Sequence, residues 1–422
     1  MKKFLQVTIL SAIYTFFKMI AGFVIGKFVA VYTGPTGIAM LGQVQSLMTI
    51  LTGITTAPVS TGLVRYTAEN WSNGEKACAP WWSACFKVTA LFTFLIIPLV
   101  ILFSSKLSTL LFDDKTYIWV IVFACCILPF SIFNTLISSV LNGQQRYKQY
   151  ILLGMLSVFV STIVMSLLIF SFNLKGALVA TALNSGVAGL VLICFCLNKS
   201  WFRIKYWWGE TDGEKIFQII KYTLMALTAV ISMPVALLLI RKILIAKTGW
   251  ESAGQWQAVW KISEIYLGVV TIALSTYFLP RLAILKNSVL IRNEINSTIF
   301  YVLFVTTCMG LGIYFLRDEI ISILFTEKFR MARELFLLQL TGDVIKVAGF
   351  LYSYTLQAQG HSKIFISSEL IFSLIFVIAS YYLINIFGVQ GANVSYLITY
   401  VMYFFFAFVF TNHFNVRNEK SR

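Results

Sequence analysis

The stretch "IGKFVAVYTG" (Ile25–Gly34) is nearly repeated, about half a chain later, as "IRKILIAKTG" (Ile240–Gly249). The two stretches share Ile, Lys, Thr and Gly at matching places, and apolar residues fill most of the rest. A second pair follows each of them, "GQVQSL" (Gly42–Leu47) and "GQWQAV" (Gly254–Val259). Matching phrases in the same order indicate an internal repeat of the kind found in membrane transporters. We therefore expect two halves of like construction.

The composition places most of the chain in lipid. Of its 422 residues, 59% are hydrophobic and only 12% are charged, whereas a soluble domain is about a quarter charged. Breaks at Gly, Pro and charge clusters leave about twelve apolar runs of the ~20 residues that a membrane-spanning helix needs. Because backbone groups in lipid must be satisfied within the segment, these runs are expected to be helices. The sequence predicts an all-α integral membrane protein.

One polar segment near the middle divides the chain. "NKSWFRIKYWWGETDGEK" (198–215) mixes Trp and Tyr with Lys and Arg, a composition that suits the headgroup layer of a membrane. We expect a six-helix lobe at 1–197, a cytoplasmic amphipathic linker at 198–215 and a second six-helix lobe at 216–422. Six is an even number, so both lobes enter the membrane the same way, as a parallel internal repeat with a cleft between the lobes.

The distribution of cations predicts that both termini are cytoplasmic. With the N-terminus inside, the inside segments hold more Lys and Arg than the outside ones, which is the usual bias of membrane proteins. This bias accounts for the net charge of +16 without a nucleic-acid partner. The apolar run that follows Met1–Lys3 continues to about Tyr32, which is too long for a cleavable signal peptide.

The residues that usually carry catalysis or bind metal are few and scattered. None of the seven cysteines forms a CxxC pair, and the two histidines lie at loop-like positions. No Gly-rich phosphate loop with GK[ST] is present. The adjacent acids Asp113 and Asp114 are typical of a solvated turn rather than an acid pair for glycosyl chemistry. We expect no enzyme, no metal and no cofactor, although a proton or sodium gradient remains open as a driving force.

Ionisable residues inside the apolar runs are the candidate functional residues, because each costs ~2.5–3.5 kcal/mol to insert at a helix centre. Six lysines are predicted to line a cationic cleft and bind a pyrophosphate or glycan: Lys18, Lys27, Lys221, Lys242, Lys261 and Lys346. Three acids are predicted to couple transport to an ion or to form ion pairs: Glu264, Asp343 and Glu369. The excess of cations favours an anion such as a phosphate or pyrophosphate in this low-dielectric setting.

Simpler interpretations apply to most of these lysines. Lys27, Lys221 and Lys242 lie near span ends, where a lysine can snorkel to the interface. Lys18 differs, because it lies at the middle of the first span with no acid at i±3 or i±4. It therefore needs a partner on another helix, water or a ligand.

Two pairs of opposite charge are spaced i, i+3 within predicted spans. Lys261 with Glu264, and Asp343 with Lys346, can neutralise each other within one helical turn. A purely structural role therefore stays open for both pairs. Gly22 and Gly26 form a GxxxG motif, which favours close helix packing.

The chain resembles the multidrug/oligosaccharidyl-lipid/polysaccharide exporter superfamily, and within it the Wzx-type polysaccharide and lipid III flippases. The stretches that carry the resemblance are "KFVAVYTGPTGIAMLGQ" (Lys27–Gln43), "KYTLMALTAVISMPVALLLIRK" (Lys221–Lys242), "GQWQAVWKISEIYL" (Gly254–Leu267), "YFLPRLAIL" (Tyr277–Leu285) and "FTEKFRMARELFLLQLTGDVIKVAGFLYSY" (Phe325–Tyr354). The resemblance covers essentially the whole chain, and the last stretch is its most specific part.

The resemblance implies a MATE-like, V-shaped transporter in a bacterial inner membrane. Its substrate would be an undecaprenyl-pyrophosphate-linked oligosaccharide, lipid III of common antigen or an O-antigen repeat unit of lipopolysaccharide, moved from the cytoplasmic to the periplasmic leaflet by alternating access. The chain would act as a monomer in the lipid bilayer, with a polysaccharide polymerase and a chain-length regulator as partners. The resemblance does not identify the glycan.

Three rival functions are weighed against this one. A cation-coupled multidrug exporter of the same superfamily is the alternative, but an excess of lysines inside the spans argues against a cavity for cationic drugs. A structural membrane protein leaves the mid-span Lys18 unexplained. A membrane glycosyltransferase or polymerase would bring a large outer loop, and the outer loops expected here are short.

Overall fold

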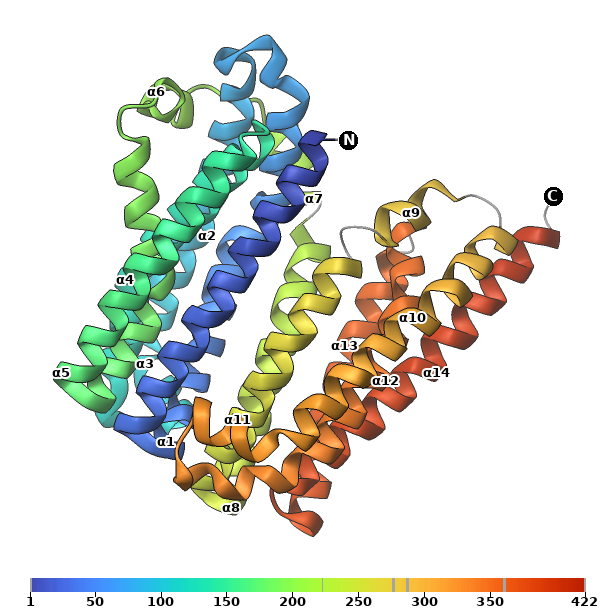
Figure 1. Ribbon diagram of the computed structural model, residues 1–422. Coiled ribbons are helices and arrows are strands. Elements are labelled where there is room, and N and C mark those ends of the chain that lie inside the picture. The colour runs from blue at the N-terminus through green and yellow to red at the C-terminus, as the bar shows by residue number, and fades with distance from the viewer. Residues whose placement is uncertain (1, 222, 275–277, 286–287, 360–361, 421–422) are drawn as a thin grey trace. The chain divides into compact units, whose positions relative to one another are not determined.

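A computed structural model of the chain describes residues 2–221, 223–274, 278–285, 288–359 and 362–420, and helices make up nearly all of them (Figure 1). The helices are α1 (Lys2–Asn70), α2 (Glu75–Leu102), α3 (Ser104–Phe112), α4 (Ile118–Gly143), α5 (Tyr147–Cys196), α6 (Ile204–Trp207), α7 (Gly213–Lys221), α8 (Thr223–Ala273), α9 (Leu279–Ile284), α10 (Ser288–Phe315), α11 (Arg317–Leu324), α12 (Phe336–Ala358), α13 (Ser362–Phe387) and α14 (Gln390–Lys420). No strand occurs within these ranges. The all-α prediction is confirmed.

Three of the long helices each contain two membrane-crossing arms. Nine helices of the described residues are long and apolar enough to span a membrane. Non-helical backbone interrupts α1 at Gly34, α5 at Asn173 and α8 at Gly249. Nine helices, with one extra segment for each of these three, give twelve crossing segments in the described part of the chain. The prediction of about twelve spans is confirmed.

The two repeated phrases end at the same kind of turn. Gly34 has φ 65° and ψ −164°, and Gly249 has φ 86° and ψ 168°. An L-residue with a side chain rarely adopts such positive φ values, whereas glycine adopts them at little steric cost. The backbone conformation thus explains why both repeated stretches end in glycine. The two copies share a turn as well as a sequence.

The helices form two compact units. One unit consists of Met1–Thr33 and Met40–Leu238, and the other of Gly34–Ala39 and Leu239–Arg422. We call them unit 1 and unit 2 and describe each by itself. The predicted domain bounds at 197 and 216, and the V-shaped arrangement of the lobes, stay predictions.

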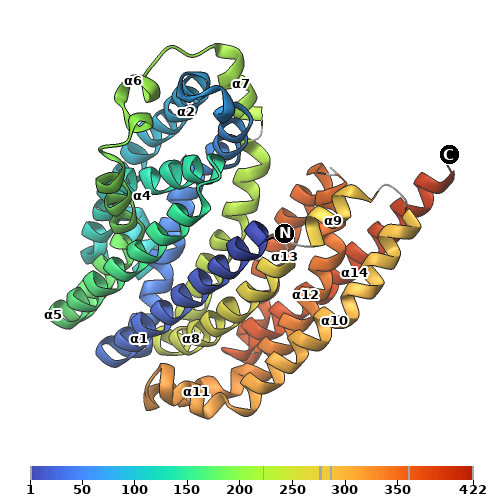
Figure 2. The ribbon, with the colours of Figure 1, turned by 45° about the horizontal axis from the view of Figure 1, so that its top comes forward.

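In unit 1, α4 packs closely along α5, as the two ribbon views agree (Figures 1 and 2). Glycine permits the approach: a Cβ on Gly189 would lie 1.9 Å from the carbonyl oxygen of Phe130. The GxxxG motif behaves differently. No described atom lies within 4 Å of a Cβ placed on Gly22 or Gly26, so the expectation of close packing there is wrong. Small residues at i, i+4 allow another helix to pack closely, but they do not bring one there.

Within unit 1, the segment at 198–215 folds against α2. Trp82 is fully buried, and its indole Nε1 donates to Thr67 Oγ1 at 2.9 Å. Trp201 and Trp207 of the segment pack on Trp82, with ring centroids 6.1 and 5.9 Å away. Their exposed fractions are 1% and 7%. The tryptophans that suggested a headgroup layer therefore include two that form a small aromatic core.

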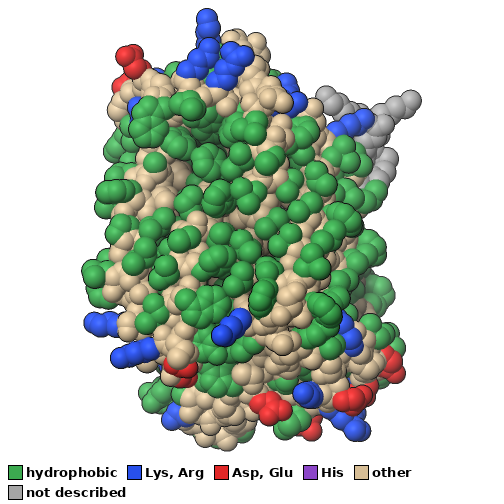
Figure 3. Space-filling model, turned by 90° about the vertical axis from the view of Figure 1, so that its left-hand side faces the viewer, with side chains coloured by type: hydrophobic (Ala, Val, Ile, Leu, Met, Phe, Trp, Pro, Cys, Tyr) green, Lys and Arg blue, Asp and Glu red, His purple; other side chains and the backbone are tan. Residues whose placement is uncertain are grey.

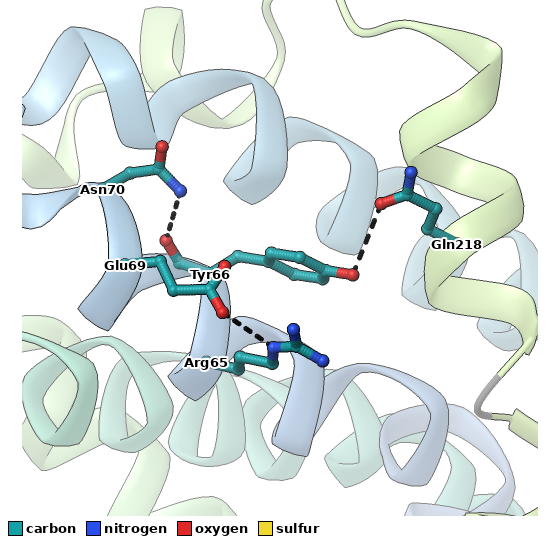
Figure 4. Close-up of polar contacts among 5 residues, drawn as sticks. All are labelled: Arg65, Tyr66, Glu69, Asn70 and Gln218. Atoms are coloured by element: carbon teal, nitrogen blue, oxygen red, sulfur yellow. Dashed lines mark hydrogen bonds and ion pairs between the residues drawn. The ribbon is translucent and has the colours of Figure 1, made fainter.

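A second contact holds α7 to the end of α1 (Figure 4). The Tyr66 hydroxyl donates to Gln218 Oε1 at 3.4 Å, and the Tyr66 ring stacks on Trp81 with centroids 3.6 Å apart. Next to it, Arg65 Nε donates to Glu69 Oε1 at 2.8 Å, an exposed i, i+4 ion pair. The pair lies within α1 and contributes little on its own, and the ring stack joins α1 to α2. The hydrogen bond to Gln218 is therefore the contact of this group that reaches α7.

The adjacent acids Asp113 and Asp114 form a turn between α3 and α4. Asp113 adopts φ 57° as the C-cap of α3. Asp114 accepts hydrogen bonds from the hydroxyl and the backbone N–H of Thr116, at 2.6 and 2.9 Å, and these bonds lower the pKa of its carboxyl. The two acids thus serve an exposed loop, as the sequence indicates.

In unit 2, α12 packs chiefly on α14 and also contacts α10 and α13, and α14 packs on α13 (Figures 1 and 2). A Cβ on Gly342 of α12 would lie 2.5 Å from the ring of Tyr396 on α14. This glycine brings the tyrosine against α12 next to Asp343.

An apolar belt covers the face of the molecule seen in Figure 3, and most Lys, Arg, Asp and Glu side chains lie above or below it. Large exposed apolar side chains elsewhere in the spans follow the same pattern; they include Phe94, Leu102, Phe300, Phe315 and Ile386, each at least 70% exposed. So much exposed apolar surface would be unfavourable in water. The chain is a multi-pass membrane protein.

Candidate functional site

A polar cavity lies within unit 1, between α1, α4 and both arms of α5. Its volume is about 420 Å³, within the range of ligand sites. One wall is a stripe on α4 at i, i+4 and i+8, made of Asn134, Ser138 and Asn142. We call this cavity, with its lining of amides and hydroxyls, the polar pocket. Polar groups at membrane depth are costly and mark functional sites more often than apolar ones.

The facing wall comes from α5, and part of it is structural. Ser161 Oγ donates to Asn184 Oδ1 at 2.6 Å, which joins the two arms of α5. Ser157 differs, because it lines the polar pocket, is 4% exposed, and its Oγ has no hydrogen-bond partner in the described part of the structure. Buried polar atoms are nearly always paired, so Ser157 is available to a ligand or to water.

Lys18 reaches the polar pocket from α1, one turn after Tyr14. Its side chain is exposed, and it forms no ion pair with a residue that the structure describes. Tyr14 lies close against α5, since a Cβ added to Gly154 would be only 2.7 Å from its ring. The mid-span lysine singled out from the sequence thus lies at a cavity rimmed by neutral hydrogen-bonding groups.

Unit 2 contains a second polar cluster, centred on Asp343 of α12. Asp343 is fully buried. Its two carboxylate oxygens accept hydrogen bonds from the hydroxyls of Tyr266 and Tyr396, each at 2.7 Å. Gln339 Nε2 donates to the same carboxylate at 3.3 Å. Donors from α8, α12 and α14 therefore meet at one acid, which satisfies a buried carboxylate as physical chemistry requires.

Lys346 lies one turn after Asp343, with its ammonium group among aromatic rings. Its Nζ is 4.9 Å from the ring centroid of Tyr400 and 5.6 Å from those of Trp260 and Tyr396. Cations within about 6 Å of such rings are attracted to their faces. The rings together with the nearby carboxylate stabilise this lysine inside the span.

Glu369 of α13 extends the cluster of unit 2. It is partly buried, and its Oε1 accepts from the Tyr403 hydroxyl at 3.3 Å. Glu264, the third predicted acid, is exposed. The structure therefore places Asp343 and Glu369 among buried tyrosines and leaves Glu264 outside that group.

The remaining predicted lysines are spread over both units. Lys27 in unit 1 and Lys242 and Lys261 in unit 2 are partly buried. Lys221 is the last residue of α7, and its side chain lies outside the described part of the structure. Whether the six lysines share one cavity stays a prediction.

Sequence reasoning missed the neutral groups of both clusters and one buried cation. Arg241 is 2% exposed and donates from Nη1 to Gln257 Oε1 at 2.8 Å. The tyrosines of α14, Tyr396, Tyr400 and Tyr403, recur at i, i+4 and i+7, which places them on one face of the helix. That spacing was a usable signal, as was the amide and hydroxyl stripe of α4. Among the described residues, no group of three or more His, Cys, Asp or Glu gathers as a metal site.

The chain is similar to characterised proteins along nearly its whole length. The chain is 27% identical over 398 residues to the lipid III flippase of Escherichia coli (strain K12), covering 93% of this chain and 94% of that protein. It is equally similar to the lipid III flippase of Shigella flexneri. No family profile matches the chain. The resemblance to the flippases that the motifs indicate is confirmed.

Solved structures show the same fold. An inward-facing MATE family multidrug transporter of the MOP superfamily matches with a TM-score of 0.74 and 12% identity, covering 94% of this chain and 95% of that one. The lipid II flippase MurJ in an inward closed conformation matches with a TM-score of 0.75 and 14% identity, covering 97% and 87%. The predicted MATE-like fold is confirmed.

Proposed function

We propose that this chain, a multi-pass membrane protein with the fold of MATE transporters and MurJ, is a flippase for a lipid-linked oligosaccharide. The observation that carries the proposal is the similarity to lipid III flippases along 93% of the chain. The substrate is an undecaprenyl-pyrophosphate-linked oligosaccharide, which crosses from the cytoplasmic to the periplasmic leaflet of a bacterial inner membrane by alternating access. Common-antigen lipid III or an O-antigen unit of lipopolysaccharide both fit this chemistry.

Lys18 is the proposed contact to the pyrophosphate. It lies at the polar pocket without a counter-ion in the described part of the chain, and no acid lines the pocket. A charge-assisted hydrogen bond to a phosphate oxygen there contributes about 1.5–3 kcal/mol. Further contacts to the anion during the transport cycle are proposed for the other predicted lysines, Lys27, Lys221, Lys242, Lys261 and Lys346.

Coupling to an ion gradient is proposed for the acids of unit 2. Asp343 and Glu369 each accept a hydrogen bond from a tyrosine, and their protonation would change the charge balance around Lys346 at membrane depth. Glu264 remains a candidate too, since it is exposed but its charge acts on Lys346 and on the buried Arg241.

The alternative function is a cation-coupled multidrug exporter. It draws support from the MATE structural match, which shares only 12% sequence identity. A lysine at the polar pocket opposes it, because a cationic drug would be repelled by Lys18.

The flippase proposal has three further parts. The chain transports without catalysing a reaction, acts as a monomer, and associates with a polysaccharide polymerase and a chain-length regulator.

The test is transport by the purified chain in liposomes. The liposomes contain undecaprenyl-pyrophosphoryl-N-acetylglucosamine, and an external galactosyltransferase reports each sugar that reaches the outer leaflet. Wild-type protein is expected to accelerate the appearance of labelled lipid over protein-free liposomes. Lys18→Ala should lower the rate about tenfold to a hundredfold, from the loss of one charge-assisted hydrogen bond.

Lys18→Arg is the matched variant, since it keeps the positive charge and should retain most of the rate. Wild-type liposomes that move no lipid but extrude a cationic dye such as ethidium would support the drug exporter instead. Full activity of Lys18→Ala would remove the lysine from the mechanism and leave the flippase function standing.

A further inference from the structure

We propose that the polar pocket of unit 1 binds the first sugars of the lipid headgroup, with Asn134, Asn142 and Ser157 as the residues that contact them. This inference rests on the proposed function and adds the part of the protein that recognises the glycan. The pyrophosphate lies at Lys18, and the adjoining sugar extends from it into the pocket.

The lining has the chemistry of a site for a neutral saccharide. Hydroxyls and carboxamides of α1, α4 and α5 line it, together with one cation and no acid. A sugar presents hydroxyl groups that both donate and accept, and amide and hydroxyl side chains can do the same. A prenyl chain would leave these groups unpaired at a cost, so the tail of the lipid is excluded from the pocket.

The polar groups of the pocket fall into two sets. Those of Ser161 and Asn184 bond to each other across the arms of α5 and hold the helices together, which is a common structural use of such residues in membranes. By contrast, Ser157 Oγ has no hydrogen-bond partner among the described residues, and Asn134 and Asn142 line the same cavity from α4. This second set faces the cavity, where its polar groups can bond to a ligand.

Two aromatic rings complete the site. Tyr14 and Tyr150 both line the polar pocket, and Tyr14 is able to approach α5 only because residue 154 is glycine. A tyrosine ring supplies an apolar face for the C–H groups of a sugar and a hydroxyl for its edge. The volume of about 420 Å³ is open to a small saccharide.

The experiment measures the binding of two lipids that differ only in the sugar. Native mass spectrometry of the detergent-purified chain resolves undecaprenyl pyrophosphate from undecaprenyl-pyrophosphoryl-N-acetylglucosamine by mass in one competition. Wild-type protein is expected to bind the glycosylated lipid about fivefold to tenfold more strongly, as a few neutral hydrogen bonds provide. Asn134→Leu, Asn142→Leu and Ser157→Ala should reduce that preference towards parity and leave binding of the bare lipid unchanged.

Two control variants make the result specific. Thr162→Val alters the same arm of α5 at a hydroxyl that bonds to its own helix, with Thr162 Oγ1 donating to Val158 O at 2.7 Å, and it should keep the wild-type preference. Lys18→Ala should weaken both lipids by the same factor, because both carry the pyrophosphate. Replacing Asn by Leu favours insertion into the membrane, and an unchanged melting temperature confirms that the variants fold.

Each outcome decides the inference. Equal binding of the two lipids by wild-type protein, pocket variants that weaken both lipids alike, or a loss as large in Thr162→Val would overturn it. Failure of the proposed function looks different: the wild-type chain would not move the glycosylated lipid in liposomes. A sugar preference that persists in such a protein would leave a glycan-binding pocket without a transport role.

Discussion

At the scale of single residues, one buried acid organises unit 2. Asp343 has no solvent exposure, and the hydroxyls of Tyr266 and Tyr396 bond to its two oxygens. These donors satisfy the carboxylate, while the ring faces around Lys346 stabilise the neighbouring cation. A proton that entered this group would remove the one charge that the tyrosines are oriented to stabilise. Asp343 is therefore the acid best placed to change the packing of α8, α12 and α14 when it is protonated.

The first prediction concerns Asp343→Asn in the liposome transport assay. The wild-type rate is expected to rise when a pH gradient is imposed, and Asp343→Asn should make the rate independent of the gradient, because the amide does not titrate. One tyrosine hydroxyl also loses its acceptor, which should lower the free energy of unfolding by about 1–3 kcal/mol. Asp113→Asn changes an exposed loop acid outside this cluster and should keep the response. An Asp343→Asn protein that still responds fully to the gradient would place the coupling group elsewhere.

At the scale of helices, glycine decides where pairs of helices come close. A side chain on Gly189 would enter the backbone of α4 at Phe130, and one on Gly254 would meet the carbonyl oxygen of Pro35 at 2.0 Å. The same residue type at Gly22 faces open space. Sequence alone does not separate these cases, because the contact depends on the partner helix. The wall of the polar pocket is built on the close α4–α5 pair, so its geometry depends on Gly189.

The second prediction compares Gly189→Ala with Gly22→Ala. The added methyl group at Gly189 must displace α4, since backbone cannot rotate away as a side chain can, and overpacking of this kind costs about 1–3 kcal/mol. Gly22→Ala should be neutral or stabilising by up to ~1 kcal/mol, because alanine favours helix. The measurement is the free energy of unfolding in mixed detergent micelles with increasing SDS. Equal stability of both variants would show that α4 and α5 pack less closely than the structure indicates.

At the scale of the whole molecule, the turns place chain segments on two sides of the membrane. The glycine turns at Gly34 and Gly249 follow the first span of each repeat, and the Asp113–Asp114 turn connects α3 and α4. Crossing the membrane an even number of times between the two repeats gives them the same orientation. The excess of Lys and Arg on the alternate segments then predicts cytoplasmic termini.

The third prediction tests this orientation in spheroplasts. A cysteine-free chain is given a single exposed cysteine, Lys115→Cys on the predicted periplasmic side or Asn73→Cys on the cytoplasmic side. A membrane-impermeant maleimide should label the first variant in intact spheroplasts and the second only after permeabilisation. The reversed pattern would invert the topology, and transport activity of both variants serves as the control for folding.

The sequence by itself determined the solvent and the architecture of this protein. Apolar runs of membrane-spanning length, the repeated phrase and its glycine, and a mid-span lysine are local features of the chain. Each has a physical cost or a period that can be recognised without a partner. From them follow the helices, their approximate number, the duplication and the prediction that Lys18 has a functional role.

Only the tertiary structure decided which polar residues meet. Tyr266 and Tyr396 are far from Asp343 in the chain, and Ser157 reaches the same pocket as Asn134 only through the packing of α5 on α4. A helix period states which residues share a face, but it does not state which face of another helix lies opposite. A single neutral amide or hydroxyl costs less to insert than a lysine or an aspartate, so only its spacing along the helix gives a signal in the sequence. The polar pocket therefore results from the contacts between helices.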